Sequence, residues 1–181
     1  MENLKILLTE EQIAQRVKEL GAEITKDFAD RVGSDDCPIF ICMLKGSTYF
    51  FADLTRQVKC PLMVDFASIS SYRNGMVSGS LDLKLDITAD VSGRDVIIVE
   101  DIVDSGRTLS FYVEELKKKN PRSIKICTFL DKKGRRTVKV DADYVGFDLP
   151  GGFVVGYGLD YAERFRELPY LADLLDPSKV K

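Results

Sequence analysis

The densest group of reactive side chains follows the apolar run Asp95–Val99. The group comprises Glu100, Asp101, Asp104, Ser105, Gly106, Arg107 and Thr108. Main-chain N–H groups at the start of a helix, together with hydroxyls and a glycine that allows close approach, form a phosphate-binding site. Carboxylates repel phosphate unless they serve sugar hydroxyls, a divalent cation or a proton. The segment therefore suggests a site for a phosphorylated sugar.

A structural interpretation of the same segment remains open. Asp104 or Ser105 can simply cap the following helix, with Glu100 and Asp101 as solvated strand ends. Neither G-x-x-x-x-G-K-[ST] nor G-x-G-x-x-G occurs in the chain, so the standard nucleotide-binding loops do not compete with either interpretation.

Composition narrows the possible chemistry. The chain has no histidine, which excludes Ser-His-Asp triads, His-paired cysteine nucleophiles and H-E-x-x-H metal sites. Any chemistry must therefore use carboxylates, Lys, Arg, Tyr, hydroxyls and backbone groups. The 26 Lys and Arg residues and 29 Asp and Glu residues give a net charge of -3, so the overall field does not favour nucleic acid.

Length and cysteine usage suggest the setting of the protein. With 181 residues, 45% of them hydrophobic, we expect one domain over 1–181. Cys37, Cys42, Cys60 and Cys127 form no C-x-x-C pair, so we expect reduced cysteines in a cytoplasmic protein. Met1–Thr9 lacks a secretory pattern, and no run approaches the ~20 apolar residues of a membrane helix.

Strands and helices are expected to alternate along the chain. Apolar runs predict buried parallel strands over 39–44, 95–99 and 123–130, and two further strands over 62–69 and 81–87. Helical spacing predicts helices from a Thr9–Gln12 capping box to Gly33, over 48–58 and over 107–119. This βαβ order predicts an α/β fold whose ligands bind beyond the carboxyl ends of the strands.

Two regions outside that alternation are expected near the same sheet edge. The segment 70–80 is rich in Ser and Gly, which is typical either of a hairpin tip or of a mobile lid. Short elements at Tyr144–Phe147 and Phe153–Tyr157, and a helix that starts near Asp160, are expected to cover the edge.

Five motifs carry a resemblance to a known family. Val99–Thr108 resembles the phosphoribosyl pyrophosphate signature of the type I phosphoribosyltransferases. The other motifs are Leu44–Ser47, Ser71–Tyr72, Asp131–Lys133 and Phe153–Tyr161, and they narrow the resemblance to the bacterial members that act on hypoxanthine and guanine. The resemblance implies a mostly parallel sheet flanked by helices, with a small hood formed by the terminal segments.

The implied reaction is purine salvage. Hypoxanthine, guanine or both would displace pyrophosphate from magnesium-bound phosphoribosyl pyrophosphate to give IMP or GMP. Glu100 and Asp101 would hold the ribose diol; whether they also bind Mg²⁺ directly stays open. Asp104 would lie near N7 of the purine, as general base or as a mainly electrostatic group. The 5′-phosphate would be bound by Ser105, Gly106, Arg107 and Thr108.

The resemblance also implies a site for the leaving pyrophosphate. Lys45 and Gly46 match the pyrophosphate loop, in which the peptide before the lysine is cis, although a plain surface turn is the alternative. Arg166 matches an arginine that faces the pyrophosphate, because its forked donors suit phosphate oxygens.

Further implied groups complete the site. Asp160 matches a carboxylate that helps to hold the second magnesium and lies at the purine site. Ser71 and Tyr72 resemble the pair that closes the lid over the reacting sugar and excludes water.

The choice of base is expected to rest on Lys132. An ammonium group only donates, so it pairs with the O6 acceptor of hypoxanthine or guanine and not with the 6-amino group of adenine. Phe153 matches a stacking aromatic and Val154 a backbone contact, although a Phe beside two Val would ordinarily be core. Most of Lys133, Arg135 and Arg136 are expected to be solvated.

The alternative function is a nucleotide-sensing regulator on the same fold that binds RNA. Such a protein needs a basic face, whereas this chain is net acidic and its lysine run, Lys117–Lys119, falls at a predicted helix end. We therefore expect no nucleic acid or membrane partner. Apolar surface on the first helix and the habit of the family suggest a homodimer or homotetramer.

Overall fold

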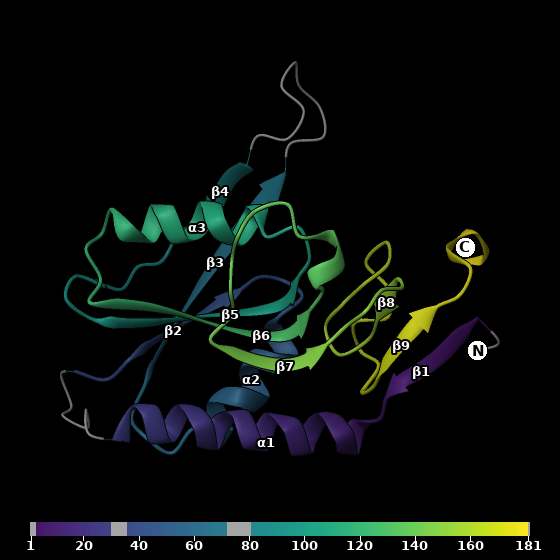
Figure 1. Ribbon diagram of the computed structural model, residues 1–181, viewed down its shortest axis with the longest axis horizontal. Coiled ribbons are helices and arrows are strands. Elements are labelled where there is room, and N and C mark those ends of the chain that lie inside the picture. The colour runs from purple at the N-terminus through teal and green to yellow at the C-terminus, as the bar shows by residue number, and fades with distance from the viewer. Residues whose placement is uncertain (1–2, 30–35, 72–80, 181) are drawn as a thin grey trace.

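The computed structural model describes residues 3–29, 36–71 and 81–180, and its centre is a six-stranded sheet (Figure 1). The strand order is β4-β3-β2-β5-β6-β7. Its strands are β2 (Ile39–Met43), β3 (Met63–Ser71), β4 (Leu81–Leu85), β5 (Asp95–Val103), β6 (Ser123–Asp131) and β7 (Tyr144–Asp148). All neighbours pair in parallel except β3 and β4, which are antiparallel. The predicted α/β fold is confirmed.

Helices cover both faces of the sheet. Helices α1 (Glu10–Asp27) and α2 (Thr48–Gln57) lie on one face, and α3 (Arg107–Lys117) lies on the other (Figure 1). Two apolar clusters fill the spaces between these layers. All five residues of β2 are buried, since both of its faces are covered. Among the described residues, η2 (Lys133–Arg135) and η3 (Pro177–Lys179) are short 3-10 helices.

The first helix begins as predicted and ends earlier. Thr9 and Gln12 form the capping box, in which the Gln12 amide accepts from the Thr9 N–H at 2.9 Å. The helix ends at Asp27, before the predicted end at Gly33, which lies outside the described residues. Its apolar positions face the core, so the predicted apolar surface on this helix is absent from the described structure.

A second, three-stranded sheet forms the hood. Its order is β1-β9-β8, with β1 (Leu4–Leu8), β9 (Leu171–Leu174) and β8 (Val154–Val155) all antiparallel. It brings the two described ends of the chain side by side, beside the carboxyl ends of the main strands (Figure 1). The expected hood of terminal segments is confirmed.

Two predictions for the tail are wrong. No helix forms near Asp160 in the described structure, where tight turns with bridges Gly156–Leu159 and Tyr161–Arg164 occur instead. Ala162 and Glu163 have φ of 53° and 62°, in the left-handed region that a right-handed helix excludes. Tyr144–Phe147 does not cover the edge either, because it belongs to β7 of the main sheet.

The predicted strand boundaries differ at two places that matter for function. Strand β5 continues to Val103, so Glu100 and Asp101 lie inside the strand and not after it. Strand β3 includes Ser70 and Ser71, and β4 pairs with it as a hairpin, whereas residues 72–80, including Tyr72 and most of the predicted lid, lie outside the described residues.

The cysteines are free, and Cys37, Cys42 and Cys127 are buried, as expected. Within the parts of the chain that are described, no helix has the length and apolar character that crossing a membrane requires.

Close packing of α1 on α2 depends on Gly21. A Cβ at this position would lie 2.5 Å from Cβ and 2.9 Å from the carbonyl carbon of Gln57. We predict that Gly21→Ala lowers the free energy of unfolding by about 1–3 kcal/mol, because overpacking outweighs the gain in helix propensity. Denaturant unfolding measures this, with exposed Lys18→Ala of the same helix as a control expected within about 0.5 kcal/mol of wild type. An equally stable Gly21→Ala would contradict the prediction.

Candidate active site

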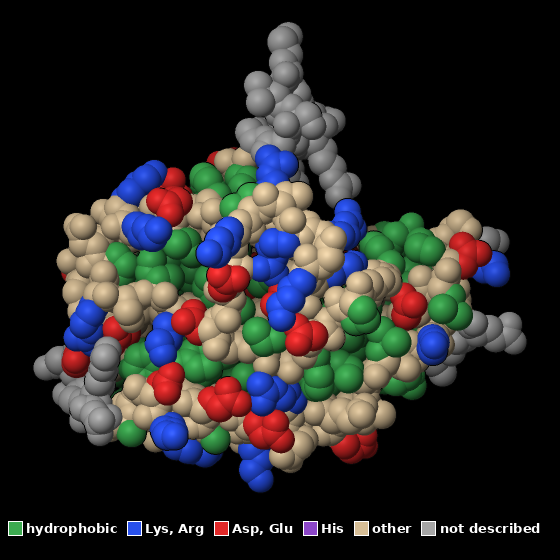
Figure 2. Space-filling model, viewed as in Figure 1, with side chains coloured by type: hydrophobic (Ala, Val, Ile, Leu, Met, Phe, Trp, Pro, Cys, Tyr) green, Lys and Arg blue, Asp and Glu red, His purple; other side chains and the backbone are tan. Residues whose placement is uncertain are grey.

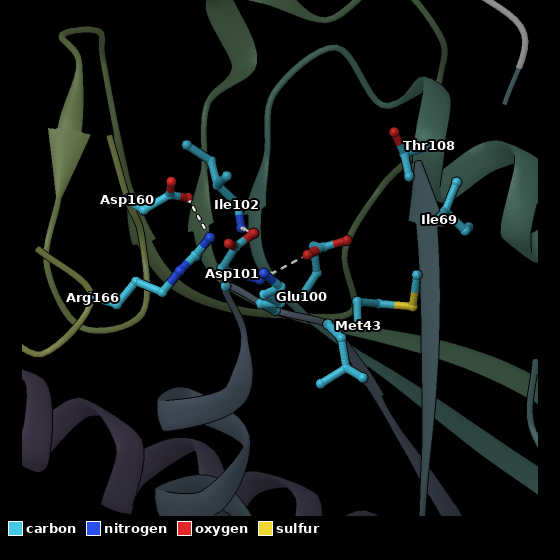
Figure 3. Close-up of a pocket in the computed structure, with 11 residues that line it drawn as sticks. Met43, Ile69, Glu100, Asp101, Ile102, Thr108, Asp160 and Arg166 are labelled. Atoms are coloured by element: carbon cyan, nitrogen blue, oxygen red, sulfur yellow. Dashed lines mark hydrogen bonds and ion pairs between the residues drawn. The ribbon is translucent and has the colours of Figure 1, made fainter. Parts of the chain in front are cut away.

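The carboxyl ends of β2 and β5 open into a polar cavity of about 300 Å³ (Figure 3). It is lined by Met43, Leu44, Lys45, Gly46, Ile69, Glu100, Asp101, Ile102, Thr108, Asp160 and Arg166. These residues come from β2 and its following turn, β3, β5, the start of α3 and the segment before β9. The fold thus gathers predicted site residues that are far apart in the sequence.

Two partly buried carboxylates lie side by side in this cavity. The Asp101 N–H donates to Glu100 Oε1 at 3.0 Å, and the Ile102 N–H donates to Asp101 Oδ1 at 2.6 Å. Burial, followed by repulsion from Asp101, raises the pKa of Glu100 well above its usual range. Burial also raises the pKa of Asp101, against the opposing effect of hydrogen bonds and the Arg166 charge. Such a pair is suited to a cation or to hydroxyl donors.

The chemistry of this pair fits a magnesium ion only with help from a ligand. Within the described residues, no three Asp, Glu, His or Cys side chains form a group that could hold a metal ion. Mg²⁺ prefers oxygen ligands and commonly uses one or two carboxylates together with substrate phosphates. Glu100 and Asp101 supply that partial set.

The turn after β2 has the geometry expected of a pyrophosphate loop. The Leu44–Lys45 peptide is cis. The Ser47 hydroxyl, which is fully buried, donates to the Met43 carbonyl at 2.6 Å, and the Thr48 hydroxyl donates to the Lys45 carbonyl at 2.6 Å. Gly46 lies against Asp101 so closely that a Cβ there would overlap the carboxylate.

Asp160 and Arg166 form an ion pair in the wall of the cavity, in the segment that contacts the Lys45–Gly46 turn. Arg166 Nη2 lies 2.8 Å from Asp160 Oδ1, and its Nη1 donates to the Gly158 carbonyl at 2.7 Å (Figure 3). The second oxygen of Asp160 accepts from the Glu163 N–H at 2.9 Å. Each carboxylate oxygen of Asp160 therefore has one protein partner and keeps a second lone pair.

A smaller cavity of about 100 Å³ follows β5. It is lined by Glu100, Ile102, Val103, Asp104, Ser105, Gly106, Thr108 and Leu109. Gly106 is the N-cap of α3, with φ of 81°, and it has no side chain with which to cap the helix. The Ser105 hydroxyl accepts from the Arg107 N–H at 3.4 Å, so a structural role for Ser105 stays open beside a role in binding. A helix N-terminus beside hydroxyls suits an anion such as phosphate.

Arg136 supports that loop and is the one of the three basic residues 133, 135 and 136 that is not solvated. Its side chain is only 16% exposed and donates to the carbonyls of Asp104 at 3.2 Å and Val103 at 3.3 Å. It also contacts the buried Asp131 carboxylate. The sequence offers no signal for this role, since these acceptors reach Arg136 only in the folded chain. Lys133 and Arg135 are 71% exposed, as predicted.

A third cavity, of about 270 Å³, adjoins the first. It is lined by Asp101, Ile102, Asp104, Lys132, Arg135, Gly152, Phe153, Val154, Leu159 and Asp160. Lys132 is only 8% exposed, and its Nζ donates to the Gly152 carbonyl at 2.8 Å. Phe153 is 47% exposed and meets Tyr161 edge-on at 5.4 Å, so it is a wall of the cavity and not part of the core.

Asp104 enters the same cavity from the loop after β5. Its Oδ2 lies 3.6 Å from Arg135 Nη1. Its Oδ1 is buried and has no hydrogen-bond partner among the described residues. A buried acceptor without a partner is costly, and it is satisfied by a ligand that donates a proton or a hydrogen bond.

Known proteins resemble this chain in sequence and in fold. Residues 3–162 match the family described as phosphoribosyl transferase domain. The hypoxanthine-guanine phosphoribosyltransferase of Bacillus subtilis is 48% identical over 171 residues, covering 94% of this chain and 92% of the relative. The hypoxanthine phosphoribosyltransferase of Escherichia coli K12 is 45% identical over 174 residues, which cover 95% of this chain and 96% of the relative.

Solved structures agree with this resemblance. A hypoxanthine phosphoribosyltransferase from Staphylococcus aureus superposes with a TM-score of 0.89 at 40% identity and covers 99% of this chain and 96% of its own. A mutant of the hypoxanthine phosphoribosyltransferase from Trypanosoma cruzi, in a ternary substrates complex, gives a TM-score of 0.91 at 37% identity and covers 96% and 97%.

Some relatives are much longer. The chain spans only 26% of the Listeria monocytogenes bifunctional protein TilS/HprT, which is 47% identical over 171 residues, or 94% of this chain. The match over the greater part of this chain, and the near full-length match to the shorter relatives, confirm the resemblance that the five motifs carried. The chain belongs to the phosphoribosyltransferase family.

Proposed function

We propose that this protein joins hypoxanthine, guanine or both to phosphoribosyl pyrophosphate and releases pyrophosphate. One observation carries the proposal. Three cavities meet at the end of β5: the polar cavity shares Asp101, Ile102 and Asp160 with the cavity that contains Lys132, and it shares Glu100 and Thr108 with the small cavity at α3. Pyrophosphate, base and 5′-phosphate are the three groups that surround the ribose in this reaction.

The ribose and its phosphates are assigned to the residues around that junction. Glu100 and Asp101 accept hydrogen bonds from the ribose hydroxyls. The 5′-phosphate is assigned to Ser105, Gly106, Arg107 and Thr108, and the pyrophosphate to Lys45, Gly46 and Arg166. Ser71 and Tyr72, whose side chains lie outside the described structure, complete the proposal as part of a lid over 70–80.

Magnesium is the proposed cofactor. When bound, it stabilises the negative charge of the leaving pyrophosphate. The candidate protein ligands are Glu100, Asp101 and Asp160; the raised pKa values of Glu100 and Asp101 support the first two, while Arg166 competes for Asp160.

The purine is assigned to the cavity of Lys132. The Lys132 ammonium donates to O6, Phe153 stacks on the ring and Val154 contacts the base edge through its backbone. Asp104 takes the proton from N7, or holds its positive charge, as N9 attacks C1′ of the ribose. The buried Asp104 Oδ1 without a protein partner supports this role.

Nothing in the comparisons supports the alternative of a regulator that binds RNA. On the face drawn in Figure 2, acidic side chains lie among the basic ones and do not leave a continuous basic surface. We therefore keep small molecules as the partners of the proposed site.

We propose a homodimer or homotetramer in the cytoplasm. Val64 and Phe66 of β3 and Leu85 of β4 point to the same face of the sheet, are from 40% to 50% exposed and offer a contact surface in place of the first helix. The free cysteines support a reducing compartment.

The proposed function is tested by product formation from phosphoribosyl pyrophosphate with each of hypoxanthine, guanine, xanthine and adenine, with and without Mg²⁺. We expect nucleotide from at least one 6-oxopurine, little from adenine and none without the metal. Equal use of adenine, or no product from any base, would refute the proposal.

Removal of the Lys132 ammonium should weaken discrimination between bases. We predict that Lys132→Ala lowers the ratio of kcat/KM for hypoxanthine to that for adenine at least about tenfold, because the buried donor that rejects the 6-amino group is lost. The matched control is Lys133→Ala, whose side chain is 71% exposed and whose ratio should not change. An unchanged ratio in Lys132→Ala would remove the donor argument.

Removal of the Asp104 charge should slow the chemical step. We predict that Asp104→Asn lowers kcat about 10²–10³-fold, since general acid–base groups typically contribute that much. Steady-state kinetics across pH measure this, with exposed Asp141→Asn as the control for loss of one carboxylate. Wild-type turnover at every pH would exclude a proton-handling role for Asp104.

The raised pKa of Glu100 predicts a conflict between stability and function. Ionisation of the buried Glu100 carboxylate lowers the free energy of unfolding. The loss is absent below the ordinary pKa of 4.5, where the group is protonated in both states, and it grows as pH rises through the raised pKa of the folded state. Glu100→Gln should therefore unfold at a higher temperature than wild type at pH 8, with little difference at pH 4, while its KM for phosphoribosyl pyrophosphate rises. Exposed Glu114→Gln is the control. If Glu100→Gln melted at a lower temperature than wild type at pH 8, ionisation of Glu100 would not be what destabilises the folded state.

A further inference from the structure

The peptide group between Gly152 and Phe153 lies between two opposite charges. Its carbonyl accepts from Lys132 Nζ at 2.8 Å, and its N–H donates to Asp173 Oδ1 at 3.1 Å. The C=O and N–H of a trans peptide point in opposite directions. The ammonium and the carboxylate therefore contact the two ends of one peptide dipole, and each favours the same orientation of that peptide.

Asp173 is held on a regular element. It lies in β9, the central strand of the hood, opposite Lys5 of β1 and Val154 of β8. The Leu174 N–H donates to the Phe153 carbonyl at 2.7 Å, so the strand holds Phe153 on both sides. The position of the carboxylate is thus set by the sheet and not by the loop that it contacts.

The Gly152–Phe153 peptide, by contrast, follows a glycine whose backbone is not restricted by a side chain. Gly152 has φ of 89°, and a Cβ there would lie 2.9 Å from Asp173 Oδ1 and 3.3 Å from its Cγ. Glycine adopts several backbone conformations at little cost, so its own preferences do not fix the orientation of the peptide that follows. The Asp173 carboxylate supplies the missing constraint.

Asp173 does not line the purine cavity. Gly152 separates that cavity from another of about 550 Å³ beneath the hood, whose lining includes Asp173, Leu8, Phe147 and Leu171. Asp173 therefore lies behind the wall of the proposed base site, and any effect that it has on the base passes through the Gly152–Phe153 peptide.

We propose that Asp173 is a positioning residue that fixes the Lys132 ammonium for recognition of the base, an inference that rests on the proposed function. One of the three Lys132 N–H donors is directed to the Gly152 carbonyl, which leaves the other two for the base. If the peptide turned, the buried ammonium would lose its acceptor and its fixed direction. Phe153 keeps a second contact with β9, because the Leu174 N–H donates to its carbonyl, so the expected loss is confined to Lys132.

The test compares variants that differ in whether they can accept the Phe153 N–H. We expect Asp173→Leu to raise the KM for hypoxanthine about tenfold and to leave the KM for phosphoribosyl pyrophosphate within twofold. Asp173→Asn, whose amide oxygen still accepts, should stay within about threefold of wild type for both substrates. Asp141→Leu, the same change at an exposed position, is the control, and Asp173→Ala replaces Asp173→Leu if the latter does not fold.

Two further measurements separate positioning from a general loss of structure. In the enzyme without substrate, the Phe153 amide should exchange its hydrogen at least about tenfold faster in Asp173→Leu than in wild type or Asp173→Asn. When Asp173→Leu is added to Lys132→Ala, the KM for hypoxanthine should change less than twofold, because the residue acts through Lys132. Additive effects would indicate an independent role and overturn the inference.

The failure of this inference is distinguishable from failure of the proposed function. A wild-type protein that makes no nucleotide from any 6-oxopurine refutes the function, and the inference about base recognition with it. An active wild type whose KM for hypoxanthine is unaffected by Asp173→Leu, or whose Phe153 amide exchanges equally in both proteins, overturns the inference alone.

Discussion

The site depends on the repulsion between two adjacent carboxylates that the fold forces together. Glu100 and Asp101 lie near the end of β5, a strand whose earlier residues are fully buried, and both are partly buried in the wall of the polar cavity. Burial raises both pKa values, and repulsion from Asp101 raises that of Glu100 further, whereas the hydrogen bond with Glu100 and the Arg166 charge offset part of the rise at Asp101. A ligand with hydroxyl donors or a cation relieves this repulsion, so that relief contributes to the free energy of binding.

The remaining parts of the site are arranged around this pair on two separate sheets. The groups assigned to sugar and phosphates follow strands of the main sheet, whereas Phe153 and Val154 belong to the hood and its preceding loop. Lys132 connects the two, because it follows β6 of the main sheet and donates to Gly152 next to the hood. In the proposed function, recognition of the base therefore depends on how the hood is seated on the main sheet.

Much of this arrangement could be predicted from the sequence because it follows from local rules. Continuous apolar runs predict the buried strands, and the acids at the end of one run predict a ligand site at the sheet edge. Arg136 and Asp173 could not be predicted, since their acceptor and donor partners come from distant segments. The helix expected near Asp160 fails because charge pattern does not reveal the left-handed residues Ala162 and Glu163. The assignment of Tyr144–Asp148 to the main sheet depends on pairing with β6, which is a long-range contact.

The contact between Gly46, Asp101 and Gly158 restricts how this sequence can diverge. A Cβ on Gly46 would overlap the Asp101 carboxylate, and a Cβ on Gly158 would overlap the Gly46 carbonyl. Three segments from different regions of the chain thus meet at two glycines. A side chain at Gly46 would require a smaller residue at position 101, whereas a side chain at Gly158 would meet backbone that no substitution removes, so substitution is expected to be conditional at the first glycine and excluded at the second.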